Sequence, residues 1–222
     1  MESRSVCPLS QIEPCINRGE YWVRFINQKG LSDIVEIGVW KGEFAALLLS
    51  ECKSINRYFM VDPWAHLSDW NKPFNISNSE FELVREEAML NTSFAKDKVV
   101  ELRNTTQQAS KFLEDDSLDF AYIDGDHTLR GITLDLNVIY PKVKQGGYIG
   151  GDDLCTTPWQ HNRGFEPTLV FPYVVFFAES MGVPVFALGQ DQFLIIKDST
   201  LGFRFTDLTG NYGCLELRST LK

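Results

Sequence analysis

Four aspartates and a histidine stand in two short stretches of the chain, each directly after a segment expected to form a buried strand. The stretches are Asp124-Gly125-Asp126-His127 and Asp152-Asp153. Two carboxylates about 4 Å apart repel by about 4 kcal/mol at an effective dielectric of 20, so a cluster requires protons or a cation. Oxygen ligands suit Mg²⁺, whereas zinc prefers nitrogen or sulfur. We therefore expect a Mg²⁺ site here, although one or two of the aspartates, Asp126 first of all, could instead cap the following helix.

His127 directly follows the first aspartate pair. A bound cation would lower its pKa and nearby carboxylates would raise it, so its proton exchange is expected near neutral pH. We consider two roles for it, a general base and a purely structural histidine.

A glycine-flanked loop, Gly38-Val39-Trp40-Lys41-Gly42, follows the first expected strand. It is not G-x-G-x-x-G, and the missing middle glycine argues against a dinucleotide. Asp62 stands 24 residues after Gly38, where an acidic group can accept hydrogen bonds from ribose hydroxyls. A nucleoside without a pyrophosphate fits both observations, and so does an ordinary strand–helix turn.

Alternating strand and helix patterns position these groups. We expect strands at residues 33–38, 57–62, 98–102, 118–124 and 147–151, helices at 42–51, 80–94, 107–113, 129–140 and 169–181, a turn at Gly146-Gly147, and a closing hairpin at 185–188 and 193–197. Such alternation indicates a mainly parallel sheet with helices on both faces, which binds ligands at the carboxyl ends of its strands.

The expected fold is therefore one doubly wound, Rossmann-like α/β domain spanning residues 1–222, with a mostly parallel seven-stranded sheet and an antiparallel edge hairpin. Its core covers residues 31–198. Residues 1–30 form a leader or lid whose aromatic residues Tyr21, Trp22 and Phe25 are expected in the core, and residues 199–222 form a C-terminal extension without an assigned structure. Two long connections, 63–79 and 154–168, are expected to be functional lids or disordered. Trp159, Arg163 and Phe165 in the second could line a substrate pocket or pack within the loop.

Composition limits the possible partners. The 222 residues carry 21 basic and 30 acidic side chains, a net charge of −9, so a nucleic-acid partner is not expected. No apolar run is long enough for a membrane span and the N-terminus carries no secretion core, so we expect a cytoplasmic protein without a membrane partner. The five cysteines form no C-x-x-C pair and are expected to be free thiols.

Three motifs carry a resemblance to a known family over about residues 33–197. Val35-Glu36-Ile37-Gly38-Val39-Trp40-Lys41-Gly42 resembles the first motif of class I S-adenosylmethionine-dependent methyltransferases. Tyr122-Ile123-Asp124-Gly125-Asp126-His127 and Gly146-Gly147-Tyr148-Ile149-Gly150-Gly151-Asp152-Asp153 resemble the metal-dependent O-methyltransferases, above all those that modify sugars of macrolide (macrocin type) and aminocoumarin antibiotics. Catechol and caffeoyl-CoA methyltransferases share a related layout.

The resemblance implies a role for each matching residue. For S-adenosylmethionine, Glu36, Gly38 and Gly42 would surround the methionine part and ribose, Asp62 would hold the ribose hydroxyls, and Trp64 and Thr106 would lie near adenine. Mg²⁺ would be bound by Asp124, Asp152 and Asp153. The base would be His127 or Asp126, and we prefer His127 because an aspartate beside metal ligands is a weak base. The catechol type usually has asparagine at the position of Asp153 and lysine at that of His127, so the resemblance favours the sugar-modifying branch.

The function expected from the sequence is Mg²⁺-dependent methyl transfer from S-adenosylmethionine to a hydroxyl of a small molecule, such as the sugar of a natural product, another polyol or a phenol. Magnesium would lower the pKa of that hydroxyl and orient it. Two alternatives remain: an NAD-dependent oxidoreductase, which the broken glycine fingerprint disfavours, and a non-catalytic methyltransferase-like partner subunit. The sequence leaves the methyl acceptor undetermined and homo-oligomer formation open.

Overall fold

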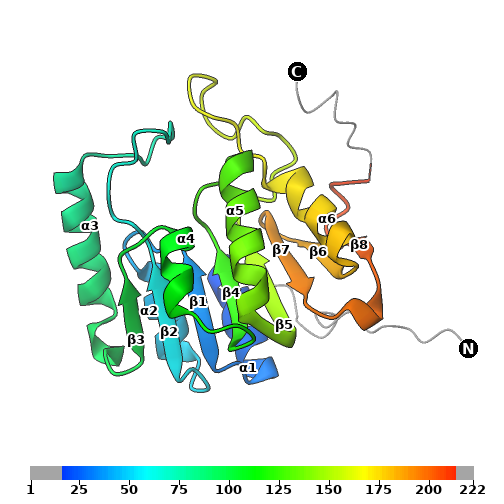
Figure 1. The fold of residues 1–222 in the computed structure, drawn as a ribbon, viewed down its shortest axis with the longest axis horizontal. Helices are drawn as coiled ribbons and strands as arrows, with labels where there is room; N and C mark the ends of the chain where they lie inside the picture. Colours follow the sequence, from blue (N-terminus) through cyan, green and yellow to red (C-terminus); the bar gives the residue numbers. More distant parts are fainter. Residues whose placement is uncertain (1–16, 214–222) are drawn as a thin grey trace, which may run out of the picture.

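The computed structural model describes residues 17–213, which form a single eight-stranded sheet between two layers of helices (Figure 1). The strand order is β3-β2-β1-β4-β5-β7-β6-β8. The strands are β1 (Asp33–Ile37), β2 (Arg57–Val61), β3 (Val99–Leu102), β4 (Leu118–Ile123), β5 (Val143–Gly151), β6 (Pro184–Leu188), β7 (Gln192–Ile196) and β8 (Arg204–Asp207). Within this described sheet β7 runs antiparallel to both of its neighbours, and the other pairs are parallel. The expected Rossmann-like α/β class is confirmed.

Six α-helices within residues 17–213 cover the two faces of the sheet. They are α1 (Arg18–Lys29), α2 (Glu43–Glu51), α3 (Asn78–Asn91), α4 (Thr106–Ala109), α5 (Leu129–Ile139) and α6 (Val170–Met181). One hydrophobic core lies between the sheet and α1, α2 and α3, and the other lies between the sheet and α4, α5 and α6. Successive strand side chains point to opposite faces, so in β4 Phe120 and Tyr122 enter the first core while Ala121 and Ile123 enter the second.

Sequence signals account for several helix ends. Asn17 caps α1 by accepting the amide of Glu20, and Gly30 ends this helix with a φ of 65°, a left-handed conformation that favours glycine. Helix α3 begins at a capping box in which Ser77 and Glu80 bond each other's backbone amides.

The structure corrects the expected sheet in two places. Within residues 17–213 the sheet has eight strands and not seven, because β8 lies in the segment 199–222 and pairs in parallel with β6, beyond the antiparallel hairpin that the sequence predicted at this side of the sheet. Strand β5 also begins four residues earlier than expected and runs through the predicted Gly146-Gly147 turn. Gly146 has a φ of 79°, and the β4–β5 register shifts between Leu118 and Phe120, so the glycines form an irregularity within the strand.

Helix α1 contributes to the core, as expected for Trp22 and Phe25, whereas Tyr21 is only partly buried and packs against it. Trp22 and Phe25 are fully buried. A Cβ atom at Gly150 would lie 2.3 Å from the Trp22 ring, so this glycine of β5 lets the indole pack directly on the sheet. The predicted leader residues 1–16 lie outside the described residues.

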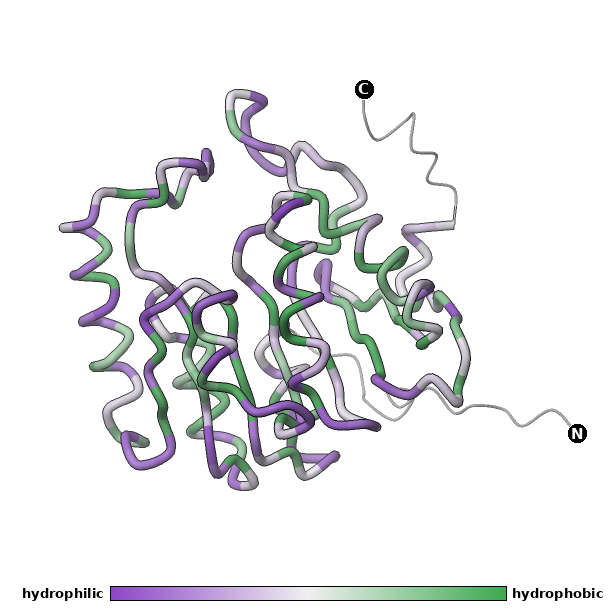
Figure 2. Tube along the Cα trace, viewed as in Figure 1, coloured by the Kyte–Doolittle hydropathy of each residue, from purple (hydrophilic) through white to green (hydrophobic). Residues whose placement is uncertain are grey.

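Two long loops, 62–77 and 152–169, leave the same edge of the sheet, at the top of Figure 1. They contact each other: Asn71 Nδ2 donates to Gly164 O at 2.9 Å, and Glu166 N donates to Asn71 O at 3.0 Å. In Figure 2 strand β7 is hydrophobic, while the projecting tip of the second loop is mostly hydrophilic.

The helices and the cysteines of the described residues bear on two further expectations, a membrane span and free thiols. None of the helices in residues 17–213 is both long and apolar enough to cross a membrane. Cys52 and Cys155 are free thiols, as expected, while Cys7, Cys15 and Cys214 lie outside the described residues.

Candidate active site

Neighbouring parallel strands bring the two predicted acidic stretches together. Strands β4 and β5 pair up to their last residues, Ile123 with Gly151, so Asp124 and Asp152 leave the sheet side by side. The loop after β1 packs tightly on the loop after β4, because a Cβ atom at Gly38 would lie 2.1 Å from the carbonyl oxygen of Asp124. The carboxyl edge of β1, β4 and β5 is therefore the candidate active site.

A guanidinium group lies between the two strand-end carboxylates. Arg18 Nη1 is 3.0 Å from Asp124 Oδ2 and also bonds Asp152 Oδ2. Burial alone would lower the pKa of Arg18, but Tyr122, Asp124 and Asp152 outweigh it and the pKa is raised. Burial in turn raises the pKa of Asp124 to about 7, with Asp152 adding to the rise and His127 and Arg18 opposing it. The cation at this point of the structure is thus a side chain of the protein.

The third carboxylate, Asp153, points to His127 instead. His127 Nδ1 bonds Asp153 Oδ2, and Asp153 Oδ1 accepts a hydrogen bond of 2.7 Å from Gln160 Nε2. Burial would raise the pKa of Asp153, but the hydrogen bond and charge of His127 outweigh it and the pKa is lowered. Burial would lower the pKa of His127, but the hydrogen bond and charge of Asp153 outweigh this effect. The pKa of His127 is therefore raised. The two groups therefore stabilise each other's charged forms.

The second ring nitrogen of His127 has a different environment. Nε2 is buried and has no hydrogen-bond partner among residues 17–213, although it lies 3.5 Å from Asp124 Oδ1. A buried polar atom without a partner is uncommon and calls for an explanation. The imidazole is thus oriented by Asp153 at one nitrogen, while the other nitrogen faces Asp124 without a hydrogen bond.

Asp126, the second candidate base, is used within the fold. Its Oδ1 accepts hydrogen bonds of 3.0 Å from the backbone amide of Thr128 and from Trp70 Nε1. The first contact closes a turn before α5, but the N-cap of this helix is Thr128 and not Asp126, because the Thr128 side chain accepts the amide of Gly131. The second contact holds loop 62–77 near the site.

Gln192 connects the acidic site to the core. Its Oε1 accepts hydrogen bonds from Trp22 Nε1 at 2.9 Å and Tyr122 Oη at 2.8 Å, and its Nε2 donates to Asp152 Oδ1. Gln192 lies outside the expected hairpin strands 185–188 and 193–197, so this role was not predicted. Its one signal is that it is the polar residue at the head of the otherwise apolar run Gln-Phe-Leu-Ile-Ile.

Arg18 was also missed. It lies in the leader, residues 1–30, for which the sequence predicted only buried aromatic residues. No motif or spacing in the sequence connects it to Asp124 and Asp152.

The predicted cofactor residue Asp62 holds the glycine loop. Its Oδ2 accepts the amides of Val39 and Trp40, both at 3.0 Å, and its Oδ1 accepts the amide of Trp64 at 2.7 Å. Burial raises its pKa, and these three amides oppose the rise. A contact between Asp62 and ribose stays a prediction, because the structure shows its oxygens bonded to the chain itself.

The two loop glycines both have left-handed backbones, with φ of 83° at Gly38 and 72° at Gly42. Gly42 is the N-cap of α2, and no side chain among the described residues caps this helix end. Glu36 is a buried residue of β1. Its side chain accepts a 2.7 Å hydrogen bond from Oη of Tyr58, a residue of the first core. Burial raises the pKa of Glu36 well above its ordinary value, so this residue favours its neutral form.

The two residues predicted to lie near adenine are both buried. Trp64 is fully enclosed and donates from Nε1 to the carbonyl of Trp40 at 2.8 Å. Thr106 begins α4 and hydrogen-bonds Asp135, a buried residue of α5. The structure therefore places both beneath the carboxyl edge rather than on an open surface.

A family model described as a methyltransferase domain matches residues 35–154, which include the glycine loop and all four aspartates. The chain belongs to this methyltransferase family. A comparison with curated protein sequences found no significant match.

Solved structures with the same fold as this methyltransferase are distant in sequence. One from Staphylococcus aureus, described as a caffeoyl-CoA O-methyltransferase, has a TM-score of 0.61 and 15% identity over 82% of this chain and 85% of its own. A Bacillus cereus O-methyltransferase in complex with SAH (S-adenosylhomocysteine) has a TM-score of 0.57 and 19% identity over 85% and 84%. A Streptomyces achromogenes O-methyltransferase involved in tomaymycin synthesis, in complex with SAM (S-adenosylmethionine), has a TM-score of 0.56 and 14% identity over 84% and 81%. At these identities they show the fold alone.

The predicted magnesium ligands fit a magnesium ion in kind but are not gathered around one point. Carboxylate oxygens are the ligands Mg²⁺ prefers. Nevertheless, within residues 17–213 no group of three or more acidic, histidine or cysteine side chains is arranged to hold a metal ion. Asp124 and Asp152 converge on Arg18, while Asp153 is turned to His127. The cation position that the structure defines is therefore the Asp124–Asp152 pair.

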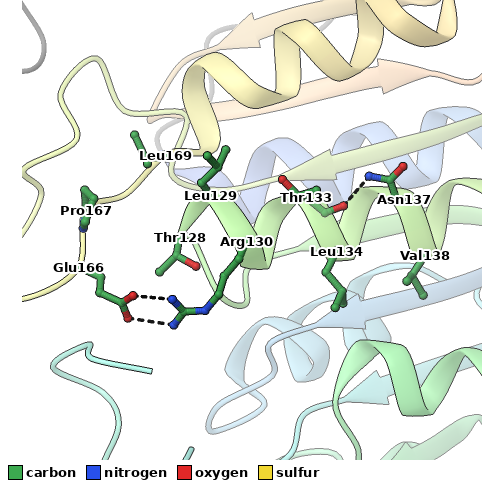
Figure 3. Close-up of a pocket in the computed structure, with 10 residues that line it drawn as sticks. All are labelled: Thr128, Leu129, Arg130, Thr133, Leu134, Asn137, Val138, Glu166, Pro167 and Leu169. Carbon is green, nitrogen blue, oxygen red and sulfur yellow. Dashed lines mark hydrogen bonds and ion pairs between the residues drawn. The ribbon is translucent and has the colours of Figure 1, made fainter. Parts of the chain in front are cut away.

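A groove of about 720 Å³ lies beside this site, along α5 and the second long loop (Figure 3). Leu129, Leu134 and Leu169 contribute apolar side chains to it, and the Arg130–Glu166 ion pair lies at one end. None of the four aspartates lines the groove. It borders the site through Thr128, the residue after His127.

Proposed function

We propose that this methyltransferase transfers the methyl group of S-adenosylmethionine to a hydroxyl of a small molecule. The observation that carries the proposal is His127, whose Nδ1 is held by Asp153 and whose buried Nε2 has no hydrogen-bond partner among the described residues. Family membership supports methyl transfer in general. Because Nε2 has no hydrogen-bond partner among the described residues, it is free to accept a proton. This supports an acceptor group that must lose a proton, as a hydroxyl does.

The loop after β1 supports a cofactor of this type. Asp62 fixes the backbone of Val39 and Trp40, and Gly42 leaves the first amides of α2 without a side-chain cap among residues 17–213. Such a helix end favours a negatively charged group, which fits the carboxylate of the cofactor's methionine part. Two structures of the same fold are complexes with SAH or SAM, which supports a cofactor of this type.

Within the site, we assign the proton to His127 Nε2. Asp153 stabilises the imidazolium that then forms, as a carboxylate paired with the other ring nitrogen does in general-base histidines. Asp126 is the weaker candidate, because its Oδ1 is already bonded to Thr128 and Trp70. The two long loops contact each other at this edge of the sheet and would exclude water from the bound acceptor.

We propose Mg²⁺ as the metal, with Asp124 and Asp152 as its ligands; Asp153, the third ligand that the resemblance implies, is bonded to His127 and Gln160 in the structure. When bound, the metal would supply Lewis-acid chemistry toward the acceptor hydroxyl. The acceptor class that the residues favour is a sugar hydroxyl of a natural product, because His127 and Asp153 differ from the lysine and asparagine usual in the catechol type. Hydroxyl groups of other polyols and of phenols are the remaining methyl acceptors that we propose.

Replacing His127 tests this assignment. His127→Gln should lower kcat by about 10²- to 10⁴-fold, the usual contribution of a general base, while leaving the affinity for S-adenosylmethionine within about twofold. Binding would be measured by isothermal titration calorimetry, and transfer by methyl-labelled cofactor with a panel of sugars, polyols and phenols. His66→Gln is the matched control, since His66 is exposed in loop 62–77.

Three results would contradict the proposal. Unchanged turnover in His127→Gln would remove His127 as the base. Calorimetric binding of NAD and not of S-adenosylmethionine would favour an oxidoreductase. Cofactor binding without transfer to any acceptor, with or without Mg²⁺, would favour the non-catalytic partner subunit.

A further inference from the structure

We propose that Arg18 is a displaceable internal cation, which neutralises Asp124 and Asp152 until a divalent cation takes its place. The guanidinium and the metal would then compete for the same two carboxylates. The metal half of this inference rests on the proposed function, whereas the role of Arg18 rests on contacts that the structure shows.

The first support is the shared contact. A single nitrogen, Arg18 Nη1, bonds one oxygen of Asp124 and one of Asp152. Two carboxylates that touch the same atom are close enough to repel strongly at a partly buried site, so one positive charge between them stabilises both. Replacing that charge with a divalent ion would satisfy the same requirement, whereas removing it without replacement would not.

The second support is that three of the other oxygens of the cluster have hydrogen-bond partners, while the fourth, Asp124 Oδ1, lies 3.5 Å from the unpartnered His127 Nε2. Asp152 Oδ1 accepts the amide of Asp153 at 2.8 Å and a hydrogen bond from Gln192. Asp153 bonds His127 through one oxygen and Gln160 through the other. The Oδ2 atoms of Asp124 and Asp152 are left as the pair that faces one common point, and Arg18 is at that point. A metal held by this pair therefore requires the guanidinium to leave.

The third support is that the side chain can leave while its helix stays. Helix α1 is anchored by the buried Trp22 and Phe25, whose contacts do not involve the guanidinium. Arg18 is the first residue of the helix, and 42% of its side-chain surface is exposed. A long side chain at a helix end can turn toward solvent by rotating about its own bonds. The displacement therefore needs no movement of the fold.

Competition has a measurable consequence for metal affinity. If the pair is open in about one molecule in ten, the apparent dissociation constant for the metal is about tenfold weaker than that of the open site. Removing the guanidinium removes this competition. The same change should make the metal-free protein less stable, because the two carboxylates then face each other without a cation.

The test is isothermal titration calorimetry with Mg²⁺ and Mn²⁺ on the full chain, together with the melting temperature with and without metal. We expect Arg18→Met to bind metal about tenfold more tightly than the unaltered protein, and to have a lower melting temperature that added metal restores. Arg24→Met is the matched control, because it changes the same helix at an arginine that pairs with Glu20. Should Arg18→Met fail to fold, Arg18→Lys is measured instead; it lacks the planar guanidinium fork and should bind metal with intermediate affinity.

The outcomes separate the inference from the proposed function. Metal binding to the unaltered protein and to the Arg18 variant with equal affinity would overturn the competition while leaving the metal proposal in place. Metal binding by neither protein would overturn the competition and the magnesium part of the proposed function together, and it would leave Arg18 as the permanent cation of the pair. Methyl transfer and its His127 test do not depend on either result.

Discussion

Asp135 is a buried carboxyl group beneath the loop that carries the catalytic candidates. It is 3% exposed on α5, and a Cβ atom at Gly125 would lie 3.4 Å from its Oδ2. Burial raises its pKa to about 7, against a hydrogen bond with Thr106 that lowers it. Asp135 therefore connects the start of α4 to the Asp124–His127 loop, in a form that holds a proton up to near neutral pH.

The raised pKa predicts how stability depends on pH. Between about pH 4 and pH 7 the folded state keeps the Asp135 proton and the unfolded chain loses it, so the contribution of this group to stability falls as pH rises through that range. The full difference would be on the order of a few kcal/mol. Asp135→Asn should flatten this part of the profile, which urea unfolding at several pH values measures.

A matched control for this experiment is Asp119→Asn. Hydrogen bonds and the charge of Lys144 lower the pKa of Asp119 despite its burial, so its contribution is lost as pH falls, in the opposite direction. A profile that Asp135→Asn leaves unchanged would contradict the assignment of the pH dependence to Asp135.

At the scale of single residues, the sequence predicted the acidic cluster but not its neutralising partners. Asp124, Asp152 and Asp153 were recognisable because each follows an apolar strand, and parallel strands end at one edge. Arg18 stands 106 and 134 residues from the two aspartates it bonds. No local pattern indicates a contact between such distant residues, because it arises only when α1 packs on the finished sheet.

At the scale of elements, α1 holds the cluster through Trp22. This indole is fully buried, packs on Gly150 of β5, and donates to Gln192, which in turn bonds Asp152. We predict that Trp22→Ala lowers the free energy of unfolding by about 3–5 kcal/mol, the usual range for a buried aromatic residue. It should also weaken metal binding, because Gln192 would no longer be fixed against Asp152.

Urea unfolding and metal titration would check the two effects separately. Phe112→Ala is the control, because this aromatic side chain is 63% exposed and should contribute less than about 0.5 kcal/mol. A Trp22→Ala protein of nearly unchanged stability would show that α1 does not depend on this residue for its position.

The elements that the sequence failed to predict have weak local signals. Strand β8 is the four-residue segment Arg-Phe-Thr-Asp with no fully buried residue, and it forms because β6 offers an unpaired edge. The start of β5 contains Gly146-Gly147, which usually indicates a turn. In contrast, the apolar run of β6, the four apolar residues after Gln192 in β7 and the capping box of α3 are local signals, and these three elements were predicted to within three residues of their bounds.

At the scale of the whole molecule, the two long loops form one cover over the carboxyl edge. Glu166 holds them together: its oxygens accept two hydrogen bonds from Arg130 and one from the amide of Asn71 at 2.8 Å. Lys72 is buried in the same contact and donates to Thr168 at 3.2 Å. Because α5 and both loops meet here, the cover is attached to the element that follows His127.

This arrangement predicts that Glu166→Ala opens the cover without unfolding the core. A partly exposed ion pair with an added hydrogen bond contributes about 1 kcal/mol, so loop opening should become about fivefold more frequent. Limited proteolysis should cut within 62–77 or 152–169 faster by that factor, while the melting temperature stays within about 2 °C. Glu101→Ala is the matched control, because Glu101 of β3 makes a similar two-bond pair with Arg85 of α3 and does not itself bond either loop. Equal cleavage rates in the two variants would show that Glu166 does not hold the loops together, and the cover would then depend on Asn71, Lys72 and the contacts of Trp70.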